Sequence, residues 1–291
     1  MIESLPWHQL VINRLLDLAA TDQLPNAIAL TCAPGWGHGE LLVEVALGLL
    51  EVKTNTSIAD FAHPDFRWIV PDGAAIKVEQ VRRLRDFAVQ TRQSAPRKVA
   101  AVLDAHLLNV NAANALLKTL EEPPANTHVL LATSNWGKLL PTVRSRCQRF
   151  QVQPDQNVAQ HWLGEQGINL KDAQFAEFGY APLTAAAVIE TQLDLTSWIS
   201  RLAHVDLEEA VAPILSDNVV ACLSRWYRRI LGHLQGDVIP SCRVAHRSLF
   251  VFADELLSAR RQIESSNAAN SRLLLEGLIV QWVQLQRQGG H

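Results

Sequence analysis

Residues 99–124 read VAAVLDAHLLNVNAANALLKTLEEPP. The unbroken apolar run at 99–103 is typical of a strand that is buried on both faces of a parallel sheet. A helical pattern follows at 111–122, where Asn111 is placed to cap the start and a double proline ends the helix. Its apolar residues repeat at helical spacing: Ala113, Leu116, Leu117 and Leu120. A strand that leads into an amphipathic helix is the unit of an α/β fold.

The same alternation extends over the first 150 residues. Further apolar runs that predict strands lie at 28–32, 66–70, 128–132 and 148–152, and further helical patterns lie at 40–50 and 77–93. After Pro154 the strand signal disappears and only helical patterns remain. We therefore predict an α/β, parallel-sheet domain over 1–153, a small helical lid over 154–196 and an all-α domain over 197–291.

Composition excludes several classes of protein. The chain has 291 residues and a formal net charge of -3, so a generally polycationic nucleic-acid binder is excluded. No stretch approaches the roughly 20 apolar residues of a membrane helix, and the N-terminus lacks the basic segment of a cleaved signal. Four separated cysteines, without a C-x-x-C pair, predict neither disulfides nor a cysteine-bound metal. We expect a cytoplasmic protein without zinc or another metal, and no membrane partner.

The loop after the first strand is the position of a phosphate-binding (Walker A) loop. Residues 32–40 read CAPGWGHGE, whereas a working loop is written G-x-x-x-x-G-K-[ST]. Gly35 and Gly37 are present, but His38 replaces the lysine and Gly39 replaces the hydroxyl residue that binds Mg²⁺. Glu40 adds a charge that repels phosphate. The sequence predicts a degenerate loop that binds no nucleotide.

The strand at 99–103 should end in the acid that holds Mg²⁺ in an NTPase of this type. Here Leu103 stands at that position and Asp104 stands in place of the catalytic glutamate, so the Walker B element is degenerate as well. Both nucleotide motifs lack residues that ATP hydrolysis requires. This agreement indicates that hydrolysis was lost in a single step.

Two segments carry a family resemblance: NALLKTLEEPP at 114–124 and LLPTVRSRC at 139–147. With HPD at 63–65 and IKVEQVR at 76–82, they resemble the clamp-loader branch of the AAA+ proteins, in bacterial DNA polymerase III. The resemblance is strong over residues 25–150 and faint beyond. It implies an AAA+ domain, a lid and a C-terminal collar through which subunits form a ring.

Two departures from the family pattern define the expected role. Relatives commonly carry four zinc cysteines before the His-Pro-Asp element, but residues 50–62 contain none, so we expect no zinc module. The degenerate loop favours a stationary, non-hydrolysing subunit over a motor subunit. The resemblance then implies that this chain binds no cofactor and that ATP and Mg²⁺ lie in a neighbouring subunit.

In the clamp-loader family the Ser-Arg-Cys arginine projects into the ATP site of a neighbour. That residue is Arg146 here, and Ser145 and Cys147 would position it. The alternative is an arginine that only pairs with a surface carboxylate. Cys147 is interpreted as a packing residue in preference to a reactive thiol.

The resemblance also implies partners. They are the motor subunits of gamma/tau type, the delta subunit, and the sliding clamp and primed DNA reached through the complex. No intrinsic ATPase is expected, although the chain would serve a DNA-directed DNA polymerase holoenzyme. An autonomous AAA+ ATPase motor and a pure structural scaffold remain as alternatives.

A basic cluster lies in the helix at 77–93. Arg82, Arg83 and Arg85 could follow a DNA phosphate backbone, or they could form a solvated helix face.

Overall fold

The computed structural model describes residues 4–52, 63–189, 194–216, 218–237, 239, 242–265 and 270–288. The chain divides into two compact units, Met1–Trp162 and Leu163–His291. The expected three-part division at 153 and 196 stays a prediction, and most of the segment expected to lack the zinc module lies outside the described residues.

The first unit is built on a five-stranded parallel sheet in the order β2-β3-β4-β1-β5. The strands are β1 Ala27–Thr31, β2 Phe66–Ile69, β3 Lys98–Val102, β4 Thr127–Thr133 and β5 Gln148–Gln151. Every residue of β1, β3 and β4 is buried, whereas the edge strands β2 and β5 are partly exposed. The five predicted strands are therefore confirmed. Unbroken apolar runs mark the three central strands because both of their faces are covered.

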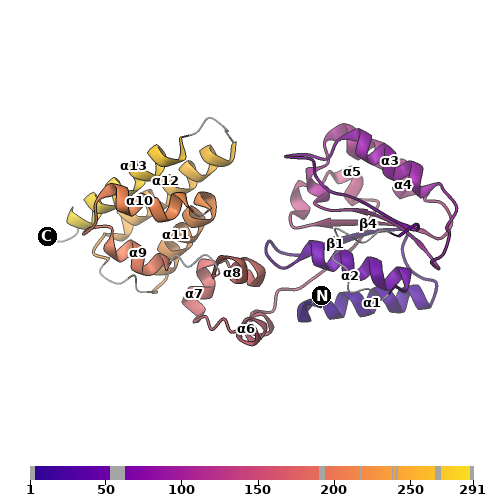
Figure 1. Ribbon diagram of the computed structural model, residues 1–291, viewed down its shortest axis with the longest axis horizontal. Helices are drawn as coiled ribbons and strands as arrows, with labels where there is room; N and C mark the ends of the chain where they lie inside the picture. The colour runs from indigo at the N-terminus through magenta and orange to yellow at the C-terminus, as the bar shows by residue number, and fades with distance from the viewer. Residues whose placement is uncertain are drawn as a thin grey trace. The chain divides into compact units, whose positions relative to one another are not determined.

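Helices cover both faces of this sheet, as Figure 1 shows: α1 and α2 lie on one face, and α3, α4 and α5 lie on the other. Their bounds are α1 Gln9–Ala20, α2 His38–Leu50, α3 Val78–Ala88, α4 Val110–Glu121 and α5 Pro141–Arg144. Three short 3-10 helices accompany them: η1 Pro6–His8, η3 Ala105–Leu107 and η4 Trp136–Lys138. The layered arrangement is the predicted α/β fold.

Two helix ends differ from the sequence-based expectation. The side chain of Asn109, not Asn111, caps α4 by accepting from the backbone N–H of Ala112, so the helix begins at Val110. The helix expected over 77–93 ends at Ala88. In the segment beyond it, the buried Asp65 carboxylate accepts hydrogen bonds from the backbone N–H groups of residues 93–95.

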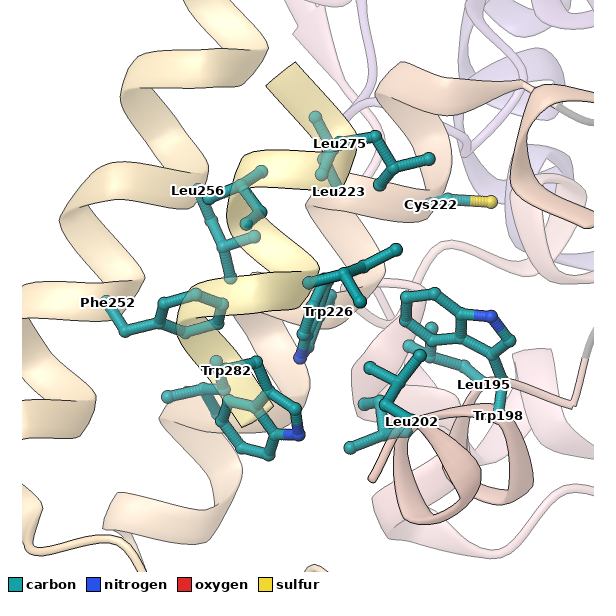
Figure 2. Packing of buried hydrophobic residues seen from close by; sticks show 14 of the residues in the cluster. Leu195, Trp198, Leu202, Cys222, Leu223, Trp226, Phe252, Leu256, Leu275 and Trp282 are labelled. Carbon is teal, nitrogen blue, oxygen red and sulfur yellow. The ribbon is translucent and has the colours of Figure 1, made fainter. Parts of the chain in front are cut away.

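The second unit is helical, as expected. Its helices are α7 Asp172–Glu177, α8 Pro182–Ile189, α9 Leu195–Arg201, α10 Leu207–Leu215, α11 Val219–Leu234, α12 His246–Ser265 and α13 Ser271–Gln288, while α6 Gln156–Glu165 spans the division between the units. Trp226 of α11 is fully buried at the centre of its core, as Figure 2 shows. Its ring contacts Trp198 of α9, Phe252 of α12 and Trp282 of α13 at centroid distances of 5.0, 5.2 and 5.8 Å. Trp226 is thus a packing residue at the meeting point of four helices.

A buried ionic cluster fastens α7 to α11 within this unit. The Glu177 carboxylate lies 3.7 Å from Arg225 and 3.3 Å from Arg229, and all three residues are buried. Burial raises the pKa of Glu177, and the two arginines oppose that rise. Breaking such a buried pair leaves an uncompensated charge, so the cluster fixes how the two helices pack.

Candidate functional site: a closed phosphate loop and an exposed arginine

The degenerate phosphate loop lies between β1 and α2, at the carboxyl ends of the strands. Gly35 and Gly37 adopt left-handed conformations, with φ of 74° and 79°, and Gly37 is the N-cap of α2. A Cβ on Gly37 would lie 2.8 Å from Leu5 Cδ1. These two glycines therefore serve the backbone turn of the loop, whatever the loop binds.

The N-terminal segment holds the loop in place. The carbonyl oxygen of Trp36 accepts a hydrogen bond from Trp7 Nε1 at 3.0 Å, and His8 Nε2 lies 2.8 Å from the same oxygen. The Trp36 side chain is buried and packs edge-on against the Trp7 ring at 5.3 Å. The other ring nitrogen of His8 lies 3.2 Å from Glu44 of α2. The loop is thus fixed from outside by two residues that sequence analysis missed.

The residue in place of the lysine pairs with the residue in place of the catalytic acid. His38 Nε2 lies 2.7 Å from Asp104 Oδ1, and Asp104 sits just after β3 in a left-handed conformation. His106 contributes to the same group, because its Nδ1 lies 2.9 Å from Thr133 Oγ1 and 3.9 Å from Asp104. Burial is the main factor that lowers the pKa of His106, with Asp104 opposing it and His38 and Lys138 adding to it. The group is satisfied within the chain.

Charge at the mouth of the loop disfavours an anion. Glu40 lies in the first turn of α2, where the helix N-terminus would otherwise attract phosphate. Burial, together with the Glu40 charge, raises the pKa of the Cys32 thiol to about 12. Gly39 provides no hydroxyl for Mg²⁺. The loop therefore has neither a fixed lysine cation nor a Ser/Thr metal ligand.

The Ser-Arg-Cys segment connects α5 to the start of β5. Because all strands are parallel, the start of β5 lies at the edge of the sheet opposite the phosphate loop. Arg146 pairs with Glu121 of α4, and its Nη1 donates to the Thr142 carbonyl at 2.9 Å. The Ser145 hydroxyl donates to that same carbonyl at 3.1 Å. The structure thus separates Arg146 from the loop of its own chain.

Cys147 is half-buried and packs against the core beneath α4 and α5. Burial raises the pKa of its thiol to about 12. A thiol with a raised pKa is a poor nucleophile, so these observations favour packing over reactivity.

The basic cluster lies on the exposed side of α3. Arg82, Arg83 and Arg85 are all exposed, while Leu84 between them is buried. Arg85 lies 3.5 Å from Asp86, its neighbour in the chain. The three side chains are thus exposed, at a place in the first unit distinct from the loop and from Arg146.

Among the described residues, no group of three or more His, Cys, Asp or Glu side chains is arranged to hold a metal ion. None of the described helices combines the length and apolar character needed to cross a membrane.

The parallel sheet, the loop between β1 and α2 and the helical unit that follows define an AAA+ fold. A DNA polymerase III gamma subunit-related protein of Thermotoga maritima shares this fold, with a TM-score of 0.55 over 95% of this chain and 99% of that one, at 18% identity. The family model described as DNA polymerase III, delta subunit, matches residues 7–156, just over half of the chain. The chain belongs to this family.

Relatives in several bacteria are named DNA polymerase III subunit delta'. The DNA polymerase III subunit delta' of Pseudomonas aeruginosa is 29% identical over 99% of this chain and 100% of its own length. The subunit delta' of Escherichia coli is 39% identical over 59% of this chain and 55% of its own. The tau subunit of Bacillus subtilis is similar over a shorter part, 42% identical over 25% of this chain and 13% of its own.

Proposed function

We propose that this chain is the stationary, non-hydrolysing subunit of the DNA polymerase III clamp loader. It would assemble with motor subunits of gamma/tau type and the delta subunit, and it would act on the sliding clamp and primed DNA through that complex. The C-terminal helical unit would join the collar. ATP and Mg²⁺ would be bound by the neighbouring subunit that faces Arg146.

The observation that carries the non-hydrolysing part is the pair between His38 and Asp104. The two positions that supply a lysine cation and a catalytic carboxylate in a working site hold each other at 2.7 Å. The capture of the Trp36 carbonyl by the N-terminal segment supports the same conclusion, because the loop backbone has a partner of its own. Restoring one motif residue would leave these other contacts in place.

The position of Arg146 supports a role in trans. A guanidinium at a γ-phosphate stabilises the charge that develops in phosphoryl transfer, and such a finger contributes about 10³–10⁵ in rate at the site it serves. Arg146 is partly exposed and lies at the sheet edge away from its own loop. It could therefore face the nucleotide of one neighbour while its own loop contributes nothing to hydrolysis.

The first test is DNA-stimulated ATP turnover by the motor subunits reconstituted with this chain, comparing wild type with Arg146→Ala. We expect a large drop in turnover with assembly intact by gel filtration. Arg261→Ala, an exposed arginine of α12, is the matched control and should turn over as wild type does. This chain alone should show no turnover above background.

Equal turnover by Arg146→Ala and wild type would exclude the finger and leave the scaffold alternative. Mg²⁺-dependent hydrolysis by the isolated chain would exclude the non-hydrolysing role and support the motor alternative.

A further inference from the structure

Arg146 is folded back onto its own chain. Its Nε and Nη2 edge faces the Glu121 carboxylate, and its Nη1 donates to the Thr142 carbonyl at 2.9 Å and lies 3.4 Å from the Ser145 hydroxyl. A guanidinium has five N–H donors. Most of them are turned toward partners in this chain, so a phosphate that approaches Arg146 must replace a contact that already exists.

The contact most easily replaced is the ion pair with Glu121. The two side chains are 34% and 46% exposed, so solvent and salt screen their attraction. The Thr142 carbonyl accepts from Nη1 alone, whereas the Nε and Nη2 edge of the guanidinium faces Glu121. A γ-phosphate carries more negative charge than a carboxylate and accepts the same fork of N–H donors. It would therefore displace Glu121.

Glu121 is held in place by the end of its helix. It is the last residue of α4, and the double proline at 123–124 ends the helix directly after it. The helix end therefore places the Glu121 backbone close to the turn that carries Arg146, because α4 contacts α5. The pair joins the two segments that the sequence analysis singled out.

We propose that Glu121 is a latch for Arg146: it holds the guanidinium in a folded-back position, which a neighbour's nucleotide phosphate releases. The proposal rests on the proposed function of Arg146. Glu121 is a positioning residue, because it acts only through the arginine. In the latched state the binding-competent form of Arg146 is a fraction of the population, and that fraction reduces the apparent affinity for the neighbour's ATP-bound site.

The test is a titration of this chain into a fixed concentration of motor subunits, DNA and ATP, with turnover as the readout. Glu121→Gln keeps the shape of the side chain and removes its charge. We expect the concentration for half-maximal turnover to fall by about two- to fivefold, the range that an exposed ion pair supports, with the plateau unchanged. Thermal unfolding of the variant should match wild type, because the pair is exposed.

Two controls isolate the latch. Glu122→Gln removes the same charge from the next residue, which is exposed, and should leave the titration unchanged. Glu121→Gln in an Arg146→Ala background should match Arg146→Ala alone, because Glu121 acts only through its ion pair with Arg146.

The outcomes separate the latch from the function on which it rests. If Arg146→Ala lowers turnover but Glu121→Gln leaves the half-maximal concentration unchanged, the latch is wrong and the finger stands. A lowered plateau for Glu121→Gln would mean that Glu121 orients the arginine in its working state, which also overturns the latch. If Arg146→Ala has no effect, the proposed function itself fails.

Discussion

A single buried carboxylate directs the chain between α3 and β3. Asp65 accepts hydrogen bonds from the backbone N–H groups of Gln93, Ser94 and Ala95, at 2.7, 2.7 and 2.9 Å. Burial by itself would raise the pKa of this carboxyl, but the three backbone donors and the Ser94 hydroxyl outweigh it and lower the pKa to about 2. Asp65 of the His-Pro-Asp motif is therefore a structural residue, because the hydrogen bonds of the folded chain stabilise its ionised carboxylate.

This geometry predicts how stability depends on Asp65 and on pH. Its pKa in the folded chain lies below the ordinary value of 3.8, so the carboxylate stabilises the fold above about pH 4. That contribution, about 2 kcal/mol, should be lost as pH falls from about 4 toward 2. At pH 7, Asp65→Asn should lower the free energy of unfolding by about 2–3 kcal/mol, because the amide turns N–H groups toward backbone donors. Urea unfolding of both proteins at pH 7 and pH 3 measures the effect.

Asp72 is the matched control. It is exposed and pairs with Lys77 at 3.0 Å on the surface, so Asp72→Asn should change the free energy of unfolding by less than about 1 kcal/mol. If Asp65→Asn and wild type have the same urea midpoint at pH 7, the carboxylate does not stabilise this turn.

At the same scale, sequence analysis could predict what the phosphate loop lacks but not what replaces it. The absence of lysine and hydroxyl is a comparison with a written motif, which requires no three-dimensional information. The pair between His38 and Asp104 joins residues 66 positions apart, and a single sequence contains no signal for that contact. Trp7 and His8 were missed for the same reason, although two aromatic side chains next to Pro6 could have indicated a packed N-terminus.

Among the elements, α11 carries the packing of the second unit. Three aromatic rings from α9, α12 and α13 meet Trp226, which is fully buried. Removing the indole would leave a cavity that these helices can fill only in part. Trp226 is therefore the side chain at which α9, α11, α12 and α13 meet.

We expect Trp226→Ala to lower the free energy of unfolding by about 3–5 kcal/mol, the range for removing a large buried aromatic side chain. Urea unfolding followed by far-UV circular dichroism measures it. Phe250→Ala on α12 is the control: its ring is 56% exposed, so the loss should stay below about 1 kcal/mol. Similar losses for the two variants would contradict a core centred on Trp226.

The elements also show where sequence patterns stop being informative. Buried strands could be predicted because each one is a run of apolar residues, and this signal lies entirely within the strand's own sequence. The start of α4 could not, because it depends on which side chain binds the free backbone N–H groups, and the path after α3 depends on a distant carboxylate. The carboxylate beyond α3 comes from a residue 28 positions away, and the cap of α4 is one of two asparagines that look alike in sequence.

For the whole molecule, charge decides how it can meet DNA. The net charge of -3 gives no general attraction to a polyanion, so contact requires a local basic surface. Arg82, Arg83 and Arg85 supply one on the exposed side of α3, with a single described ion pair, that between Arg85 and Asp86. We propose this face as the DNA contact of the chain within the assembled complex.

Each phosphate contact releases condensed counterions, so the number of contacts can be read from the salt dependence of binding. Replacing both Arg82 and Arg85 with Gln should weaken binding of primed DNA by the reconstituted complex. It should also reduce the slope of log affinity against log salt by about 1.8. Arg261→Gln on α12 removes an exposed arginine elsewhere and should leave the slope unchanged. An unchanged slope in the double variant would assign the α3 arginines to a solvated helix face, because a side chain that touches phosphate cannot be removed without changing the number of ions released.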